Sequence, residues 1–327
     1  MNTKHRRRRL ACLVVLTAMA APIFISYPTG AVGVTDPGVT ECDKLASYPH
    51  DYKRVAPPVR DVYDTAQAIA ACREALVKFP NHPRLQFLLG MLLDSEPRAR
   101  WVKSPGLPFL KKASDQGYLA ATYVKGKALL KTWGRGRRSE GRNLLFVAAR
   151  KGHLQAQAEL PRHVGRMNEA QRKEALEWGE LAIKRGDVDA YASIASAYLL
   201  VMSDAKHYPK AIDYLHKGDR AGSLEAMALL GRLQVFPFAP NGMRNLLPEN
   251  HYGGMQRMLD AARGGSKRAA FYLGLLYTGV TYSVSARREK MIYWFCRAGE
   301  RGRYMVAEML EADVSTYRCN NKKSVKQ

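Results

Sequence analysis

The sequence lacks the short motifs that mark the common enzyme classes. It contains no GxSxG elbow, no phosphate-binding P-loop and no GxGxxG fingerprint. Its eight histidines are never three or four residues apart, and none lies beside a cysteine pair, so no zinc or metalloprotease motif is present. We therefore expect no cofactor, no bound metal and no catalytic residue, and we favour a binding protein over an enzyme.

Long apolar runs are nearly absent, and the clearest one lies at the start of the chain. Lys4 and the arginines at 6–9 precede an apolar run from Leu10 to Ile25, which contains Pro22. The run is shorter than the roughly 18 apolar residues that a membrane-spanning helix needs. This pattern is typical of an export signal. We place the signal at residues 1–31, with cleavage after residue 31 preferred to cleavage after residue 20 and an uncleaved anchor as the alternative.

Acidic residues are scarce, with 29 Asp and Glu against 52 Lys and Arg, which gives a formal net charge of +23. The signal carries five cations and no anion, so the mature chain keeps 23 − 5 = +18. Such a surface attracts anions. An exported protein, periplasmic or secreted, meets acidic proteins and acidic polysaccharides rather than nucleic acid. We expect a protein partner, with an acidic polysaccharide as a second possibility and solubility alone as the plain alternative.

Cysteines are few, and Cys12 lies within the expected signal. The mature chain keeps four, an even number that favours two disulfides in an oxidising compartment. Four cysteines allow three pairings. Proximity in the sequence favours Cys42 with Cys72 and Cys296 with Cys319. The alternative is a set of buried free thiols.

What the sequence does contain is an internal repeat, marked by a recurring glycine that we number position zero. The glycine follows a run of basic residues, as at the C-terminal end of a helix, where glycine adopts a left-handed conformation. An earlier unit fits the same frame with Asn81 at zero. The frame predicts antiparallel helix pairs that bury their apolar faces by stacking. The glycines are Gly117, Gly152, Gly186, Gly222, Gly265 and Gly302, with spacings of 35, 34, 36, 43 and 37 residues.

Apolar residues within the units follow helical spacing. Position +4 is small in most units and position +8 is large, so both are expected to pack inward on one helix face. Position +9 is glycine in four units, which admits a close helix contact. Pro161 takes that place in the third unit and is expected to end its helix early. The four glycines are Gly90, Gly126, Gly231 and Gly274.

The motif AxxxLGxxYxxG, most complete as "AAFYLGLLYTG" from Ala269 to Gly279, resembles the Sel1-like repeat, a relative of the tetratricopeptide repeat. The resemblance covers roughly residues 81–312. It implies an all-α, right-handed α-solenoid of antiparallel helix pairs that is used for protein binding. It also implies a cysteine-bearing N-terminal cap with a tetratricopeptide-like unit over 32–100 and Sel1-like repeats over 101–318. We expect residues 319–327 to form a basic tail.

The first helix of each pair usually lines the concave surface on which such scaffolds bind. At 100° per residue, positions +3, +6 and +10 are expected to face away from the packed side. These positions mix cations with aromatic rings, which suits an acidic peptide or a sugar chain. The alternative is a solvated face with a few packed rings. The expected partner-binding residues are Arg84, Tyr123, Lys127, Arg162, Arg232, Arg268 and Phe271.

Three further segments are candidates for a binding or catalytic site. "KTWGRGRRSEGR", residues 131–142, is expected to be a solvated loop and is the best anion site in the chain. The proline-rich insertion at 235–252 is a second candidate for the binding face, or it covers a gap between units. Ser203 and Lys206 match the SxxK pair of penicillin-binding enzymes. They keep a cell-wall or β-lactam-directed hydrolase or binding protein as the alternative to an exported scaffold.

Overall fold

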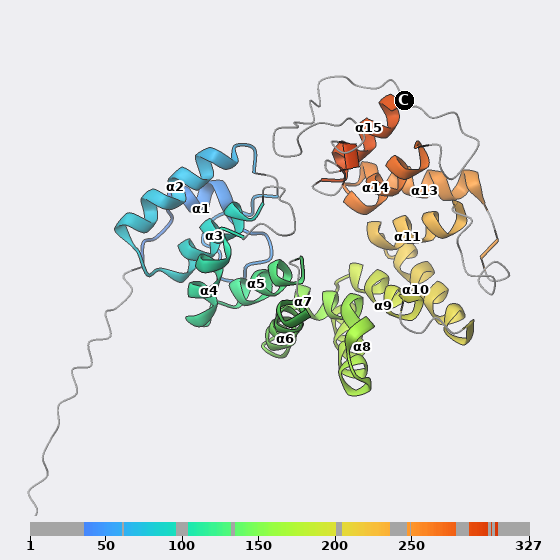
Figure 1. Cartoon of the computed structure of the whole chain (residues 1–327), viewed down its shortest axis with the longest axis horizontal. Helices are drawn as coiled ribbons and strands as arrows, with labels where there is room; N and C mark the ends of the chain where they lie inside the picture. The colour runs from blue at the N-terminus through green and yellow to red at the C-terminus, as the bar shows by residue number, and fades with distance from the viewer. Residues whose placement is uncertain are drawn as a thin grey trace, which may run out of the picture. The chain divides into compact units, whose positions relative to one another are not determined.

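The computed structural model describes residues 36–60, 62–95, 104–131, 135–200, 205–235, 247–248, 250–278, 288–299, 302 and 305–306 (Figure 1). Every regular element in these ranges is a helix. The all-α prediction is therefore confirmed. The expected signal and the basic tail lie outside the described residues, and the domain boundaries stay predictions.

The helices form the expected antiparallel pairs, joined in each case by direct packing of the first helix on the second. Neighbouring first helices also contact one another: α7 and α11 both pack on α9, and α11 packs on α14. This arrangement is a helical repeat solenoid. The pairs are α3 (Pro83–Leu93) with α4 (Leu107–Asp115), α5 (Leu119–Lys131) with α6 (Arg135–Arg150), α7 (Leu154–Glu159) and the 3₁₀ helix η1 (Leu160–Arg166) with α8 (Glu169–Lys184), α9 (Asp189–Leu200) with α10 (Tyr208–Arg220), α11 (Leu224–Val235) with α13 (His251–Arg263), and α14 (Lys267–Leu276) with α15 (Arg288–Arg297). A short 3₁₀ helix, η2 (Ala205–His207), precedes α10.

The turn glycines end the second helices. Five of the six have a left-handed backbone, with φ between +78° at Gly117 and +103° at Gly265. Each glycine N–H donates to a carbonyl three residues back, and the next residue donates five residues back, as Gly222 does to Asp219 and Ser223 to Gly218. This is the Schellman arrangement, in which glycine avoids the Cβ penalty of positive φ.

The last turn differs from the expected frame. Gly299, with φ +74°, is the left-handed residue after α15, whereas Gly302 is helical and buried. The sequence "RAGERG" offers two glycines, and the helix ends at the first of them. Position zero of the last unit is therefore Gly299, and the choice of Gly302 was wrong.

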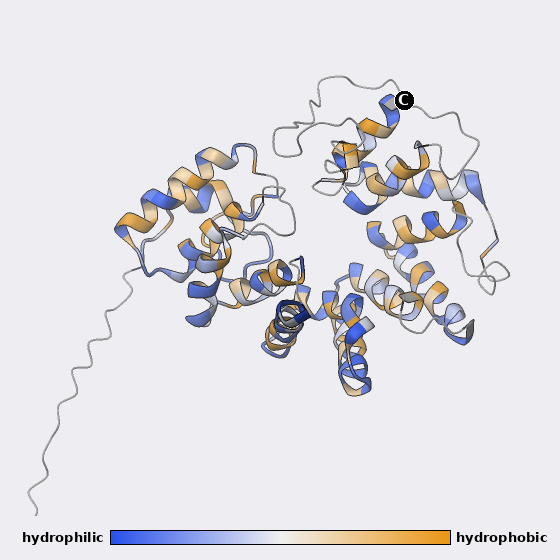
Figure 2. Ribbon diagram, viewed as in Figure 1, coloured by the Kyte–Doolittle hydropathy of each residue, from blue (hydrophilic) through white to orange (hydrophobic). Residues whose placement is uncertain are grey.

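The repeat positions +4 and +8 form the core, as expected. All described +4 residues, including Ala121, Ala226 and Ala269, are fully buried. The large +8 residues Ile194 and Leu230 are also buried. Figure 2 shows the result on the ribbon: most helices carry hydrophobic residues along one side and hydrophilic residues along the other.

The +9 glycines lie where two helices approach closely. A Cβ built on Gly231 would lie 2.5 Å from the carbonyl oxygen of Gly254 on α13, and one on Gly126 would lie 3.0 Å from that of Gly141 on α6. Any side chain there would force the pair apart. In the third unit Pro161 ends α7 at Glu159 and the chain continues as η1, so the expected early end is confirmed.

The N-terminal part is fixed by a disulfide. Cys42 on α1 (Glu41–Ala46) is bonded to Cys72 on α2 (Thr65–Lys78), as expected. A loop of 30 residues corresponds to about 3.7 kcal/mol of stabilisation in the chain-entropy model. Cys296 is also disulfide-bonded. Cys319 lies outside the described residues, so its pairing with Cys296 stays a prediction.

The expected loop at 131–142 is mostly helical. From Arg135 onward these residues belong to α6, so the loop prediction was wrong there; residues 132–134 lie outside the described ranges. Arginine is a good helix former, and the apolar positions of α6 pack on α5. None of the described helices is long and apolar enough to span a bilayer.

Candidate partner-binding surface

Three of the seven expected partner-binding side chains are buried. Arg84 is 6% exposed, Tyr123 3% and Phe271 6%, so the expectation that they face solvent was wrong. Tyr123 and Phe271 occupy position +6, which is buried in every described unit because each first helix contacts the neighbouring first helices as well as its own partner. These three side chains therefore pack in the interior, below the exposed residues of the first helices.

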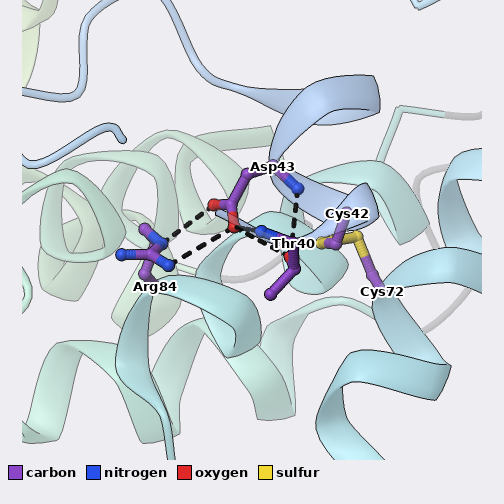
Figure 3. The surroundings of a disulfide bond; sticks show 5 residues. All are labelled: Thr40, Cys42, Asp43, Cys72 and Arg84. Atoms are coloured by element: carbon purple, nitrogen blue, oxygen red, sulfur yellow. Dashed lines mark hydrogen bonds and ion pairs between the residues drawn. A yellow bond between two sulfur atoms is a disulfide. The ribbon is translucent and has the colours of Figure 1, made fainter. Parts of the chain in front are cut away.

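Arg84 is part of a buried ion pair next to the disulfide (Figure 3). Its Nε lies 2.8 Å from Asp43 Oδ1, and its Nη2 donates to Asp43 Oδ2 and to the carbonyl oxygen of Gly38. Asp43 in turn accepts from the backbone N–H and the hydroxyl of Thr40, which closes the capping box of α1. Arg84 therefore fixes the N-terminal segment to α3 and is not available to a partner.

Tyr123 contacts a histidine ring and the ammonium group of a lysine. Its ring stacks on His153 at 4.5 Å between centroids, and the ammonium of Lys127 lies 5.3 Å above it. Burial raises the pKa of Tyr123, and the carboxylate of Glu159 adds to the shift. The phenol is therefore neutral, and Lys127 is the member of this group that reaches the surface.

The loop after α1 lies against the starts of two first helices. The Tyr118 hydroxyl at the start of α5 donates to Asp51, and the backbone N–H of Leu154 at the start of α7 donates to the Tyr52 hydroxyl at 3.2 Å. The rings of Tyr52 and His153 meet edge to face. No sequence pattern indicated these contacts, which join residues as many as 102 positions apart.

A chain of ion pairs crosses the later first helices. Arg162 on η1 lies 3.7 Å from Glu159 and 3.7 Å from Glu225 on α11, and Arg268 on α14 lies 3.0 Å from the same Glu225 oxygen. Glu225 therefore holds two of the expected partner-binding arginines in place. Each of the four side chains keeps about a fifth to a quarter of its surface exposed.

Arg162 reaches Glu225 across α9, on which both η1 and α11 pack. The buried residues of α9 include Ser193 and Ser196. Their hydroxyls donate to carbonyl oxygens of α9 itself. The guanidinium thus bridges two units that are not neighbours in sequence.

A second set of contacts joins successive units at equivalent positions. Asp189 accepts from the Ser223 hydroxyl at 2.7 Å, and Glu225 accepts from the Ser266 hydroxyl at 3.1 Å. Both serines also cap their own helices. The sequence analysis missed these acids, although an acid at +3 followed by serine at +1 of the next unit was a readable signal.

Glu159 is ionised in this environment. Burial by itself would raise its pKa, but the hydrogen bond with His163 and the charges of Arg162 and Lys127 outweigh that effect and hold the pKa well below its usual range. The surface therefore presents fixed charges of both signs.

Arg232 differs from the other cations of this region because it is exposed. It lies two turns after Glu225 on α11, and its guanidinium lies over the ring of Tyr272 at 5.3 Å. We define the first-helix surface by seven charged residues of the first helices that are exposed or half-exposed and that include the expected cations and the acids described above. They are Lys127, Glu159, Arg162, Asp189, Glu225, Arg232 and Arg268.

The other candidate sites lie mostly outside the described residues and stay predictions. Ser203 lies outside the described residues, and so does most of the 235–252 insertion, of which Leu247 is buried against the α9–α11 core. Within the described ranges, no three His, Cys, Asp or Glu side chains are close enough to hold a metal ion.

No family model and no curated protein matches the chain. Among solved structures it is similar to a Sel1 repeat protein from Oxalobacter formigenes, with 21% identity and a TM-score of 0.43 over 69% of this chain and 93% of the other. It is also similar to c5321, a protective antigen present in uropathogenic Escherichia coli strains displaying an SLR fold, with 18% identity and a TM-score of 0.38 over 76% of this chain and 53% of the other. Both are repeat proteins of the class that the sequence motif resembles. The fold assignment itself rests on the helix pairs described above.

Proposed function

We propose that this chain is an exported Sel1-like repeat scaffold that binds a segment of another envelope protein on the first-helix surface. The observation that carries the proposal is the ion-pair chain from Glu159 through Arg162 and Glu225 to Arg268, which fixes two partly exposed guanidinium groups, one on η1 and one on α14. Fixed, planar donors bind carboxylates and backbone carbonyls at a low cost in side-chain entropy.

Arg232 is the side chain best suited to direct contact. It is exposed, it lies over Tyr272, and no carboxylate among the described residues forms an ion pair with it. An acidic side chain of the partner would supply that pair. The formal charge that remains without the expected signal, 23 − 5 = +18, favours such a partner and speeds its approach.

The experiment compares Arg232→Glu with Lys184→Glu in the full chain. Both changes reverse one exposed cation, but Lys184 lies on a second helix, α8, so the variants have equal net charge. We expect the wild type and Lys184→Glu to retain the same envelope protein in affinity capture, and Arg232→Glu to retain at least fivefold less. Equal retention by the two variants would place binding elsewhere. A retained polysaccharide without protein would replace the protein partner by an acidic polymer.

Arg268 is a poorer choice for charge reversal. Its replacement by glutamate would put two carboxylates beside each other at Glu225 and disturb Arg162 as well. A loss of binding would then not separate contact from structure.

A further inference from the structure

The loop that follows α1 is closed at its base. The Ser47 hydroxyl donates to the carbonyl oxygen of Ala56 at 3.0 Å, and the backbone N–H of Val59 donates to the carbonyl oxygen of Ser47 at 2.8 Å. We define residues 47–59 as the N-terminal loop. Because its ends are joined, the middle of the loop can leave the surface while the base stays in place.

The middle of the N-terminal loop lies on α7 through Tyr52. The Tyr52 ring meets the ring of His153 edge to face at 5.9 Å between centroids, and the Tyr52 hydroxyl accepts from the Leu154 N–H at 3.2 Å. His153 also stacks on Tyr123 of α5, at 4.5 Å. Tyr52 is 58% exposed, whereas His153 is fully buried. The loop therefore meets α7 at one buried histidine and the residue after it.

The hydrogen bonds of His153 fit only the neutral imidazole. Its Nδ1 accepts from the Ala156 N–H at 3.3 Å, so the single proton of the neutral ring lies on Nε2. Nε2 is buried and has no hydrogen-bond partner among the residues that the structure describes. A second proton would occupy Nδ1 and would point at the Ala156 N–H. Protonation therefore breaks the cap of α7 and leaves a buried cation, which is costly.

The charges nearest to the ring oppose protonation as well. Arg185 at the end of α8 donates to the carbonyl oxygen of Gly152 at 3.1 Å, which places a guanidinium group beside the start of α7. Burial lowers the pKa of His153 to about 4, and the charges of His50, Arg185 and Lys127 act in the same direction.

The acids of the surrounding elements are engaged with other groups. Asp51 accepts from the Tyr118 hydroxyl, Glu159 pairs with His163, and Asp187 accepts from the backbone N–H two residues later. The charges that act most strongly on the pKa of His153 are all positive. The titratable and charged side chains around His153 and its two tyrosine neighbours are Tyr48, His50, Asp51 and Arg54 of the N-terminal loop, Lys127 of α5, Glu159 and Arg162 of α7 and η1, and Arg185 and Asp187 at the end of α8 and after it.

We propose that the N-terminal loop is an acid-sensitive latch, which is held on α7 while His153 is neutral and from which protonation of His153 releases Tyr52. The closed base and the contact of Asp51 with Tyr118 keep the released loop tethered. Release uncovers the start of α7. The latch operates within this chain, so its test does not depend on the partner proposed above.

The direction of the switch follows from proton linkage. The pKa of His153 is about 4 with the loop in place and about 6.5 in an exposed ring, so the attached state is favoured above pH 6.5 and loses that advantage as the pH falls. Between pH 7 and pH 5 the equilibrium constant for release should rise about 20-fold. By reciprocity, removing Tyr52 should make His153 easier to protonate.

The first test measures the pKa of His153 by NMR titration of the full chain, with the resonance assigned by its loss in His153→Ser. It compares Tyr52→Ala with Tyr63→Ala, a matched control whose side chain is fully exposed ahead of α2. We expect the acid dissociation constant of His153 to fall at least about tenfold in Tyr52→Ala and to change less than about 1.5-fold in the control. An unchanged constant in Tyr52→Ala overturns the proposal.

The second test follows hydrogen exchange of two amides at pH 7 and pH 5, corrected for the intrinsic pH dependence of exchange. The Leu154 N–H donates to the Tyr52 hydroxyl, and the Val59 N–H donates within the base of the loop. We expect opening at Leu154 to rise about 20-fold and opening at Val59 to rise less than about threefold. Equal rises at both amides mean that the whole region unfolds, and no rise at Leu154 means that acid does not release the loop; either result overturns the proposal.

Two substitutions connect the acid response to His153. His153→Ser removes the titrating ring and keeps a cap, because Ser223 and Ser266 cap their helices from the same repeat position. We expect this change to abolish the acid response at Leu154, and the control His216→Ser on α10 to retain it. A response that persists in His153→Ser contradicts the proposal.

Discussion

The buried ion pair between Arg84 and Asp43 should be one of the strongest single interactions of the N-terminal part. Arg84→Met removes the guanidinium and keeps the apolar stem, which leaves Asp43 charged and almost fully buried. Loss of one partner of a buried pair costs about 3–5 kcal/mol. Asp43 keeps two donors from Thr40, at 2.9 and 2.8 Å, so we expect the lower end, about 3 kcal/mol.

The assay must be local, because a repeat protein does not unfold as one two-state unit. Hydrogen exchange of the α3 amides reports the free energy of opening this part of the chain. A cost of about 3 kcal/mol accelerates exchange by more than about 100-fold. The control Arg73→Met lies on the exposed side of α2 and should change exchange by less than about threefold.

A double-mutant cycle decides whether the pair itself carries this energy. Asp43→Asn alone leaves Arg84 charged, with the carbonyl oxygen of Gly38 still accepting from its guanidinium group, at a cost of about 3 kcal/mol. The double variant Asp43→Asn, Arg84→Met leaves no buried charge, so its cost should be at least about 2 kcal/mol smaller than the sum. Strict additivity, or an Arg84→Met chain that exchanges like the wild type, would refute a structural role for Arg84.

Two further predictions follow from the repeat geometry. Gly231→Ala puts a Cβ 2.5 Å from the Gly254 carbonyl oxygen and should cost about 1–3 kcal/mol, whereas Gly136→Ala, with open space around its Cβ, should stabilise by up to about 1 kcal/mol. Hydrogen exchange of the α11 amides in the first variant and of the α6 amides in the second checks this. His153 is fully buried, burial lowers its pKa to about 4, and its unprotonated Nδ1 accepts from the Ala156 N–H. The pKa of a histidine in the unfolded chain is about 6.5. The contribution of His153 to the free energy of unfolding is therefore complete above pH 6.5, and about 3 kcal/mol of that free energy is lost as the pH falls to 4. His153→Ser keeps a cap and should remove most of this pH dependence; an unchanged pH profile would contradict the assignment to His153.

Features set by local spacing could be predicted from the sequence. The burial of Ala121 and Ala226 and the left-handed turn at Gly222 depend on residues within one helix pair, and helical periodicity makes them visible. The break at Pro161 is likewise local, because proline lacks the N–H that the helix needs.

Features set by contact between units could not be predicted in the same way. Tyr123 and Phe271 are buried because neighbouring first helices cover position +6, and one helix alone does not reveal its second neighbour. Arg84 pairs with Asp43, which lies 41 residues earlier in the chain, and no sequence pattern connects the two residues. For this reason the sequence predicts that Arg84 binds a partner, whereas its actual role is a buried ion pair within the fold.

The residue after each turn glycine shows how the units are linked and where a partner can bind. In the earlier units Tyr118 and His153 occupy this position and contact Asp51 and Tyr52 of the N-terminal loop. In two later units serine occupies it and joins successive first helices through acids at +3.

The residue after the turn glycine thus makes two kinds of contact. In the earlier units it holds the N-terminal loop against the starts of α5 and α7. In the later units it joins neighbouring first helices and leaves their charged residues partly exposed. A partner that recognises the charged residues should therefore contact α11 and α14 in preference to α5 and α7. Arg232 is consequently a sharper probe of binding than Lys127, although both lie over a tyrosine ring.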